Sequence, residues 1–389
     1  MLEGTLACQA ATRRTPRERS AVLRSTEAGE SDMQTEKPSY QPSQTKRPER
    51  IDRDSPSFRR LADLLIGAKI ALALRAMAEY QIADKLAGGP KTVETLAAEI
   101  VLSEDVLRRT LRALAQYGVF AETADGKFEN TDLSEYMRCD VEASLREAIL
   151  FLNHEASLRA WLELEQSLKD GRSHFADANG ASLFALIAED AKLNEHFARC
   201  MANLYGPEAG KIASGYAFGQ FRTMIDVGGG QGHIMTAILS AHKAPKATVF
   251  DLEPTVVMAR KFLREKGFAD RCNAVGGNFL VEVPSGYDAY ILKSILHDWD
   301  DVQATKILQA CRKAIPREGR LLIIEEVMVP RQSVGNPHRF IDLEMLVHFG
   351  GKERNAAEYS DLMTDAGFSL QRIVPIKDSF FSVIEGVPV

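Results

Sequence analysis

The sequence predicts an α/β protein, with a doubly wound, mostly parallel sheet that ends in an antiparallel hairpin and is preceded by a smaller helical region. After residue 206, short apolar runs alternate with helical patterns, which is the order of consecutive βα units. The last two apolar runs, 369–376 and 380–385, are joined by residues 377–379, too few for a helix. Upstream, residues 61–130 follow the order helix, helix, hairpin.

Residues 1–55 form the first of three expected parts, a disordered tail. They are rich in Arg, Glu, Ser, Thr, Pro and Gln, and Tyr40 is their only aromatic residue. Such a segment buries too little apolar surface to offset the entropy lost on ordering. It also lacks the apolar core of a secretory signal, and Met33 is an alternative start of the protein.

The second expected part, residues 56–205, begins with a winged-helix pattern. Helices are expected at 92–100 and from the N-cap Ser103 to Tyr117, where Gly118 ends the second one. Two short strands around the Asp125-Gly126 turn follow, and a helical connector then runs to residue 205. A first helix is indicated by apolar residues at three- and four-residue spacing, namely Leu61, Leu64, Leu65, Ala68, Leu72 and Met77. The connector contains aromatic residues that we expect to be buried: Phe151, Trp161, Phe175, Phe184 and Phe197.

A winged helix often reads DNA, so the charge of this region matters. Arg108, Arg109 and Arg112 lie on the helix that would enter the groove. Residues 61–140, however, hold 9 Lys and Arg against 13 Asp and Glu. Because phosphate contacts supply most of the affinity for nucleic acid, a DNA-binding regulator is a disfavoured alternative.

Composition excludes several other classes of protein. The net charge is −6, which gives no reason to expect an anionic partner. No apolar stretch is long enough to span a bilayer. The 5 cysteines are scattered without a CxxC spacing, so neither a disulfide framework nor a zinc site is indicated. A cytoplasmic protein in a reducing compartment fits these observations.

The third expected part, residues 206–389, carries a glycine-rich turn after its first strand. Asp226 to Gly232 read D-V-G-G-G-Q-G, and these glycines let a ligand approach the backbone closely. Asp251 follows Gly228 by 23 residues at the end of the second strand, where a carboxylate can accept both hydroxyls of a ribose. The alternative interpretation of Asp251 is that it only caps the next helix. His233 stands where a dinucleotide fingerprint has its third glycine, which disfavours a nicotinamide oxidoreductase.

Two further blocks carry the most specific signal. Residues 292–301 read L-K-S-I-L-H-D-W-D-D, and residues 350–354 read G-G-K-E-R. Together with 226–232, 250–252 and 276–279, they resemble the S-adenosylmethionine-dependent O-methyltransferases of the plant caffeate and hydroxyindole type, which include bacterial natural-product enzymes. The resemblance covers residues 58–389. It implies a homodimer formed through the winged-helix region, a Rossmann-like class I methyltransferase domain, S-adenosyl-L-methionine as cofactor, and a small hydroxylated, aromatic acceptor.

The resemblance also implies which residues hold the cofactor. Gly228 would lie against the methionine moiety, Asp251 would hold the ribose, and Lys293 would contact the cofactor's polar backbone. Asn278 and Phe279 would face the adenine, although the family usually has aspartate in place of Asn278. An amide oxygen still accepts a hydrogen bond from the adenine amino group, so we expect weakened rather than lost binding. The full predicted cofactor set is Asp226, Gly228, Gly230, Asp251, Leu252, Asn278, Phe279 and Lys293.

His297 matches the family's general base, and Glu325 and Glu353 match the acidic residues that flank it. A phenol has a pKa of about 10 and histidine one of about 6.5, so complete proton transfer would be uphill by roughly 5 kcal/mol. Proton removal concerted with attack avoids that cost, and a carboxylate beside the imidazole would orient it and favour the imidazolium. Hydroxylation or pericyclic chemistry on the same fold and cofactor is the main alternative, disfavoured because His297 and both glutamates are present.

The acceptor pocket is the least specific expectation. By analogy with the family, its walls are expected among Trp161, Met201, Asp298, Met345 and His348. Packing in the core explains Trp161 and Met201 at least as well, and a packed helix face explains His348 equally well. Neither HxxxH nor a His and carboxylate spacing typical of metal sites occurs, so we expect no metal dependence.

Overall fold

The computed structural model describes residues 53–329 and 338–389. The expected tail therefore lies outside the described residues, apart from its last three positions. The first elements are α1 (Pro56–Leu65) and α2 (Gly67–Glu79), which continue one another through Ile66. The Ser55 side chain caps α1 by accepting from the backbone N–H of Phe58 at 3.2 Å, and Pro56 suits the first helical position.

The predicted winged-helix pattern is confirmed in its helices and hairpin. After α3 (Ile82–Lys85) come α4 (Val93–Ile100), α5 (Glu104–Ala115), β1 (Phe120–Glu122), β2 (Phe128–Asn130) and α6 (Asp132–Glu135). The antiparallel strands β1 and β2 turn at Gly126, whose φ of +78° a residue with a Cβ adopts only with strain. Ser103 stands at the N-cap of α5, but its side chain makes no capping hydrogen bond, so the first turn of α5 relies on Glu104 and Asp105 at the positive end of the helix.

Helices alone make up the connector. They are α7 (Arg146–Leu152), α8 (Glu155–Leu162), α9 (Leu164–Asp170), α10 (Phe175–Asn179), α11 (Leu183–Glu189) and α12 (Ala191–Gly215). Helix α12 continues through Pro207, so the domain boundary expected at residues 205 and 206 falls inside it. Of the aromatic residues expected to be buried, Phe151 and Phe175 are, whereas Phe184 is 45% exposed and stacks on Phe349 at the surface.

The sheet of the third part has seven strands in the order β5-β4-β3-β6-β7-β9-β8. Its elements are η1 (Phe218–Gln220), β3 (Thr223–Val227), α13 (His233–Ala241), β4 (Lys246–Asp251), α14 (Glu253–Glu265), β5 (Cys272–Gly276), β6 (Ala289–Lys293), η2 (Leu296–Asp298), α15 (Asp301–Ala314), β7 (Arg320–Glu326), α16 (His338–Phe349), α17 (Ala356–Asp365), β8 (Phe368–Pro375) and β9 (Phe381–Pro388). Strands β3 to β7 run parallel to one another, whereas β9 pairs antiparallel with both β7 and β8. The predicted closing hairpin is thereby confirmed.

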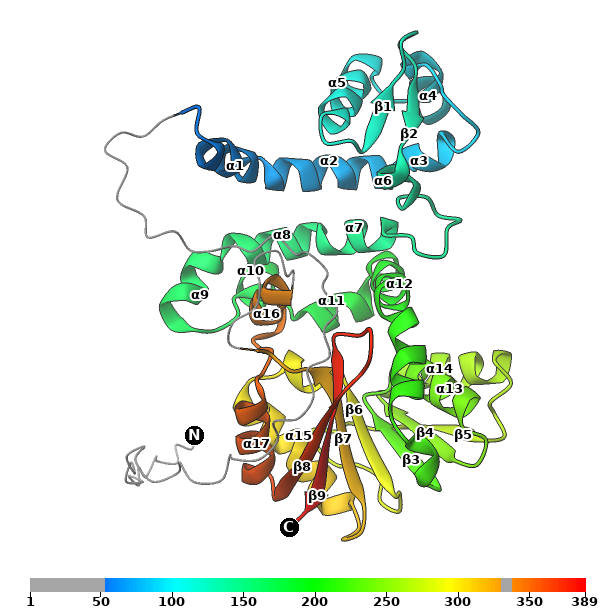
Figure 1. The fold of residues 1–389 in the computed structure, drawn as a ribbon, viewed down its shortest axis with the longest axis vertical. Helices are drawn as coiled ribbons and strands as arrows, with labels where there is room; N and C mark the ends of the chain where they lie inside the picture. The colour runs from blue at the N-terminus through cyan, green and yellow to red at the C-terminus, as the bar shows by residue number, and fades with distance from the viewer. Residues whose placement is uncertain (1–52, 330–337) are drawn as a thin grey trace, which may run out of the picture. The chain divides into compact units, whose positions relative to one another are not determined.

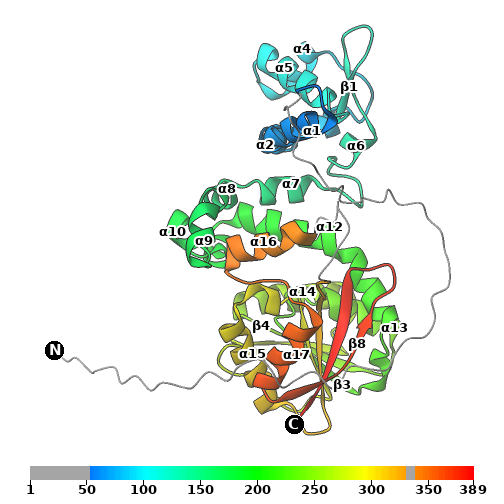
Figure 2. The same ribbon diagram turned by 60° about the vertical axis from the view of Figure 1, so that its left-hand side comes forward.

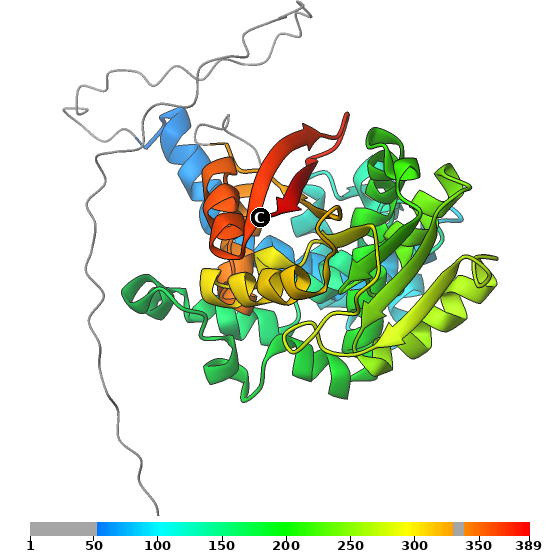
Figure 3. The same cartoon turned by 90° about the horizontal axis from the view of Figure 1, so that it is seen from below.

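Two helical layers cover the sheet. Figure 1 shows α15 and α17 on one side of the sheet and α13 and α14 on the other, and Figure 3 shows the same layers from below. Alternate strand residues serve the two layers: Met224 belongs to the core under α13 and α14, and Ile225 belongs to the core under α15 and α17. Because both faces are buried, the central strands are mostly apolar, and their chain order reverses between β3 and β6.

The connector helices and α16 share a third core. Figure 2 shows α16 running beside α8, α9, α10 and α12. Val347 of α16 is buried there among Phe151, Phe175 and Cys200. None of the helices in the described ranges, 53–329 and 338–389, has the length and apolarity needed to cross a membrane.

Candidate active site

The predicted site residues gather at one edge of the sheet. Val227, Asp251, Lys293 and Glu325 stand at or near the carboxyl ends of β3, β4, β6 and β7. In a parallel sheet these ends lie side by side, and the crevice next to the strand-order reversal is where such folds bind ligands. The topology therefore brings together groups from positions about 100 residues apart in the chain.

The glycine turn after β3 leaves space above the strand ends. A Cβ on Gly228 would stand 2.4 Å from the side chain of Ile295, so this position admits no larger residue without a shift of that neighbour. Gly230 has a φ of +57°, and a Cβ built on it would meet no atom within 4 Å. The turn is thus tightly packed at Gly228 and open at Gly230, as a surface that receives a ligand must be.

The carboxylate of Asp251 closes this turn. One oxygen, Oδ2, accepts the backbone N–H of Gly230 at 2.9 Å, and Oδ1 accepts that of Leu252 at 2.7 Å. Burial raises the pKa of Asp251, and those backbone N–H groups oppose the rise. A carboxylate offers about four lone-pair directions, so at least one remains for a ligand's hydroxyl beside those used by the two N–H groups and the Thr255 side chain. Asp251 therefore both fixes the turn and can accept from a ribose.

Asp226 and Lys293 provide buried charges beside the turn. Asp226 is 1% exposed, and its Oδ2 has no hydrogen-bond partner within the described part of the chain. Burial and the charge of Asp251 raise the pKa of Asp226 to about 7, opposed by Lys293. The Lys293 ammonium lies over the rings of Tyr205 and Phe381, 4.9 and 4.7 Å from their centroids, and burial lowers its pKa to about 8. A buried donor and a buried acceptor are thus left for a ligand with both an amino and a carboxylate group.

Asn278 and Phe279 follow β5 at the rim. The Asn278 side-chain oxygen accepts the backbone N–H of Leu280 at 2.9 Å and keeps one lone pair for a ligand. Phe279 lies edge-on to Trp299, with ring centroids 6.2 Å apart, and its ring would touch a Cβ on Gly228. The orphaned Asp226 oxygen, the open turn and this aromatic wall fit the expected cofactor, S-adenosyl-L-methionine.

His297 and Glu353 form the centre of the expected chemistry. His297 Nδ1 lies 2.8 Å from Glu353 Oε1, and its side chain is 17% exposed. A carboxylate only accepts, so Nδ1 carries the proton in this pair and Nε2 is the nitrogen free to take another. Asp298 Oδ1 lies 3.6 Å from Nε2, beyond a good hydrogen bond but close enough to act through its charge.

These carboxylates make His297 a stronger base. Burial disfavours the imidazolium, but Asp298, Glu353 and Glu325 outweigh it and raise the pKa of His297 to about 9. Proton transfer from a phenol of pKa about 10 is then far less uphill than the roughly 5 kcal/mol expected for an ordinary imidazole. A consequence of the raised pKa is that the imidazolium predominates at pH 7.

Glu325 acts on the backbone rather than on the ring. Its Oε1 accepts the backbone N–H groups of Ile295, Leu296 and His297 at 3.0, 2.6 and 3.4 Å. Its Oε2 accepts the Tyr359 hydroxyl at 2.5 Å. Of the two glutamates predicted to flank the imidazole, only Glu353 bonds to it; Glu325 holds the loop that carries it.

Arg354 holds the same loop from its carbonyl side. The guanidinium is fully buried and donates to the carbonyls of Leu296 at 2.7 Å and Trp299 at 2.8 Å, and also to Asp301. Arg354 and Glu353 are consecutive residues of an extended segment, so their side chains point to opposite sides. One therefore reaches the ring and the other the loop backbone, an arrangement that the sequence analysis did not predict.

Two of the residues predicted to line the acceptor pocket, Trp161 and His348, both contact Glu344. Trp161 Nε1 donates to Glu344 Oε2 at 2.9 Å, and His348 Nδ1 lies 3.3 Å from Glu344 Oε1. Met201 packs partly buried in the same cluster as Trp161, and the Met345 carbonyl accepts the N–H of Gly351. Glu344 was not predicted; its only sequence signal is the four-residue spacing to His348 on a mostly apolar helix.

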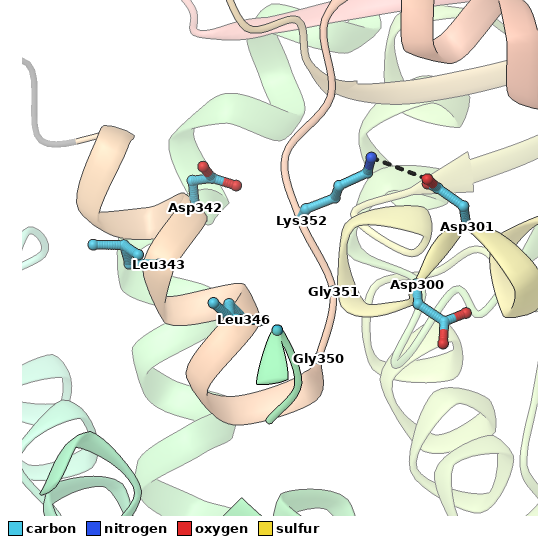
Figure 4. Close-up of a pocket in the computed structure, with 9 residues that line it drawn as sticks. Asp300, Asp301, Asp342, Leu343, Leu346, Gly350, Gly351 and Lys352 are labelled. Atoms are coloured by element: carbon cyan, nitrogen blue, oxygen red, sulfur yellow. Dashed lines mark ion pairs between the residues drawn. The ribbon is translucent and has the colours of Figure 1, made fainter. Parts of the chain in front are cut away.

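A surface pocket of about 310 Å³ lies on the other side of α16. Figure 4 shows Asp342 of α16 on the side toward Lys352, which pairs with Asp301 at 3.0 Å. None of the residues predicted to bind the cofactor lines this pocket, and neither does His297. The predicted site and this pocket are thus separate. The described residues contain no group of three or more His, Cys, Asp or Glu placed to hold a metal ion.

Comparison with known proteins identifies two parts of the chain. Residues 161–369 match the profile of the O-methyltransferase domain, and residues 62–138 match that of the O-methyltransferase dimerisation domain. A phenazine O-methyltransferase of Lysobacter antibioticus is 36% identical over 329 residues, 85% of this chain and 96% of its own. A mitomycin biosynthesis 6-O-methyltransferase of Streptomyces lavendulae is 35% identical, over 80% of this chain and 89% of its own.

A solved structure agrees in fold as well. The crystal structure of an O-methyltransferase from neocarzinostatin biosynthesis, in complex with S-adenosylmethionine and 2-hydroxy-5-methyl naphthoic acid, superposes with a TM-score of 0.76. The two chains are 31% identical, and the match covers 85% of this chain and 98% of that one.

Proposed function

The chain belongs to the O-methyltransferase family and is an S-adenosylmethionine-dependent O-methyltransferase of the bacterial natural-product type; on that premise we propose that its acceptor is a small phenol whose proton His297 removes. The observation that carries this proposal is the His297 and Glu353 pair, with Nδ1 bonded at 2.8 Å and Nε2 free. The relatives act on phenazine and mitomycin compounds by their names, which supports an aromatic acceptor.

Residues of this chain divide the work of the reaction. When bound, the cofactor supplies a methyl group on a positively charged sulfur, ready for attack by an oxygen. We assign its binding to Asp226, Gly228, Gly230, Asp251, Leu252, Asn278, Phe279 and Lys293. Among these, Asp251 would accept from the ribose, while Asp226 and Lys293 would meet the amino and carboxylate groups. His297 would then fix the acceptor hydroxyl by accepting its proton at Nε2.

Proton transfer to Nε2 turns His297 into an imidazolium. Glu353 stabilises that charge through Nδ1, and Asp298 does so from the other side of the ring. The loop must not move while this happens, since attack requires the oxygen in line with the methyl group. Glu325 and Arg354, which bond to the N–H and C=O groups of the loop, are the positioning residues. An intact base with its partner also weighs against hydroxylation or pericyclic chemistry.

We further propose that the enzyme is a homodimer. Helix α1 has no buried residue, and its side chains Leu61, Leu64 and Leu65 are 61, 69 and 74% exposed. The match to the dimerisation domain begins within this helix, at residue 62. An apolar stripe of this kind is stable only when another surface covers it. Replacing Leu64 and Leu65 by Asp should shift the protein from dimer to monomer in analytical ultracentrifugation. An unchanged dimer would show that α1 lies outside the interface.

The winged-helix region is proposed to bind no nucleic acid. Each of its three helix arginines already has an acidic partner: Arg108 pairs with Glu94, Arg109 with Asp105 and Arg112 with Glu122. Its surface is therefore not a free basic patch. We propose 1–55, 56–205 and 206–389 as the three parts of the chain, with the second boundary lying inside α12. We also propose that the protein is cytoplasmic, in keeping with the unpaired state of Cys139, Cys200, Cys272 and Cys311.

Product analysis tests the proposed function directly. The protein is incubated with S-adenosylmethionine carrying a labelled methyl group and a panel of phenols, and the products are separated and analysed by mass spectrometry. We expect the label in an aryl methyl ether. Label on nitrogen or carbon only, or no transfer to any hydroxyl, would contradict the proposal.

A further inference from the structure

The carboxylate of Glu344 has no cation to balance it. Glu344 lies on α16, and its side chain is 21% exposed. Within residues 53–329 and 338–389, its polar partners are the Trp161 indole and the His348 ring, and neither Lys nor Arg pairs with it. Burial lowers the pKa of His348 to about 4, so this ring is neutral at physiological pH. Burial raises the pKa of Glu344 to about 7, because the charged form of a carboxyl group placed this way is costly unless a further group satisfies it.

The oxygens of Glu344 act as acceptors in the surrounding hydrogen bonds. His348 Nε2 lies 2.8 Å from the Ser157 hydroxyl, and Nδ1 faces both the Glu344 carboxylate and its backbone carbonyl. The neutral ring has one N–H, and two acceptors face Nδ1, so Nδ1 donates and Nε2 accepts from Ser157. Trp161 therefore donates to the Glu344 carboxylate and the His348 N–H to the Glu344 backbone carbonyl at 3.1 Å, so α8 and α16 together hold the residue in place.

Helix α16 is also a wall of the proposed reaction site. It packs against η2, which carries His297. Gly351, just after α16, rests on the His297 carbonyl so closely that a Cβ there would lie 1.9 Å from the oxygen. The Asp342 side chain accepts the backbone N–H of Glu353 at 2.9 Å. The helix that presents Glu344 is thus fixed to both members of the His297 and Glu353 pair.

We propose that Glu344 is a specificity-determining residue that selects acceptors carrying a second hydrogen-bond donor, a hydroxyl or an amino group, away from the hydroxyl that is methylated. The inference rests on the proposed function, because it takes the region where α16 packs against α8 and η2 as the acceptor site. A donor on the acceptor would give the Glu344 carboxylate the partner that the protein does not supply. An acceptor with a methoxy group at that position would leave it unsatisfied and would be rejected.

Four naphthols that differ at one position test this. The compounds are 2-naphthol, 7-methoxy-2-naphthol, 2,7-dihydroxynaphthalene and 7-amino-2-naphthol. For the wild type we expect kcat/KM to be about 10- to 100-fold higher for the two donor-bearing compounds than for the methoxy compound. Glu344→Gln keeps an oxygen for Trp161 and should reduce this ratio several-fold, and Glu344→Leu should abolish it. Glu165→Gln on α9, an exposed carboxylate paired with Lys169, is the matched control and should leave the ratio unchanged.

A structural role for Glu344 predicts a different result. If Glu344 only ties α16 to α8, Glu344→Leu lowers kcat/KM for all four compounds alike and the ratio stays at its wild-type value, which would overturn the inference. Calorimetric titration of the same compounds into the complex with S-adenosylhomocysteine measures recognition without methyl transfer. Donor-dependent binding without transfer would contradict the proposed function and support the inference. Equal binding of all four compounds would overturn the inference, whatever their turnover.

Discussion

The loop that carries His297 and the helix that carries Glu344 face one another, and they are held in different ways. The loop is fixed through its backbone: Glu325 accepts three of its N–H groups and Arg354 donates to two of its carbonyls. Helix α16 presents Glu344 and His348 through side-chain contacts, with Trp161 and Ser157 as their partners.

This difference separates the base, which every acceptor requires, from the side-chain contacts of α16, which only one kind of acceptor requires. A backbone held by buried charges keeps its geometry whatever side chains line the pocket, so the base can be the same for many acceptors. Contacts between side chains change with a single substitution, and with them the preferred acceptor changes. The account therefore expects damage to the loop to affect every substrate and damage to α16 to affect only some.

The largest effect is expected at Arg354. Arg354→Leu removes the charged donor from the carbonyls of Leu296 and Trp299, of which the Leu296 carbonyl keeps the Trp299 N–H, and the loss of each hydrogen bond should cost about 1–3 kcal/mol. We expect the free energy of unfolding to fall by about 2–6 kcal/mol in denaturant titration. Lys352→Met is the matched control, because Lys352 shares Asp301 with Arg354 but is partly exposed, and it should change stability by about 1 kcal/mol or less. Equal stability of the two variants would show that the loop does not depend on Arg354.

The second-largest effect is expected on the affinity for the cofactor. Asp251→Ala removes the proposed acceptor for the ribose hydroxyls, and charge-assisted hydrogen bonds contribute about 1.5–3 kcal/mol each. Affinity for S-adenosylhomocysteine, measured by calorimetry, should fall about 10- to 100-fold or more. Asp251→Asn keeps the shape and loses the charge, so its affinity should lie between those of the wild type and Asp251→Ala. Unchanged affinity in Asp251→Ala would exclude the ribose role.

A smaller and more specific effect is expected at Glu353. The carboxylates around His297 raise its pKa to about 9, so kcat/KM should rise with pH up to about that value, as the imidazolium loses its proton. Glu353→Gln removes one of these charges and should move the rising limb about 1–2 pH units lower. Glu265→Gln, on an exposed face of α14, should leave the profile in place. A profile for Glu353→Gln that coincides with the wild type would show that Glu353 does not set the pKa of the base.

Local sequence patterns were sufficient for the fold. The seven-stranded sheet, the closing hairpin and the winged helix follow from periodicity and turn residues, which act over a few positions. His297 and Glu353 were found because their blocks resemble those of a known family. The sequence did not reveal that Glu325 serves the backbone and Glu353 the ring, since both are glutamates near one histidine.

The contacts missed in the sequence depend on packing between distant elements. Glu344 meets Trp161 across 183 positions of the chain, and no local pattern marks that pair. Arg354 reads as one more charge in a polar block, yet it is fully buried because the loop carbonyls surround it. The prediction for Phe184 was wrong in the opposite direction. An aromatic residue in a helical connector predicts burial, but Phe184 lies on the exposed face of its helix, α11.

The central claim is that His297 takes the proton of the acceptor, and the turnover of His297→Ala on two phenols tests it most directly. One phenol is weakly acidic, and the other is already ionised at the assay pH. The account predicts a loss of about two to four orders of magnitude for the weakly acidic phenol, a far smaller loss for the ionised one, and unchanged affinity for S-adenosylhomocysteine. Methylation of the weakly acidic phenol by His297→Ala at the wild-type rate would contradict the claim.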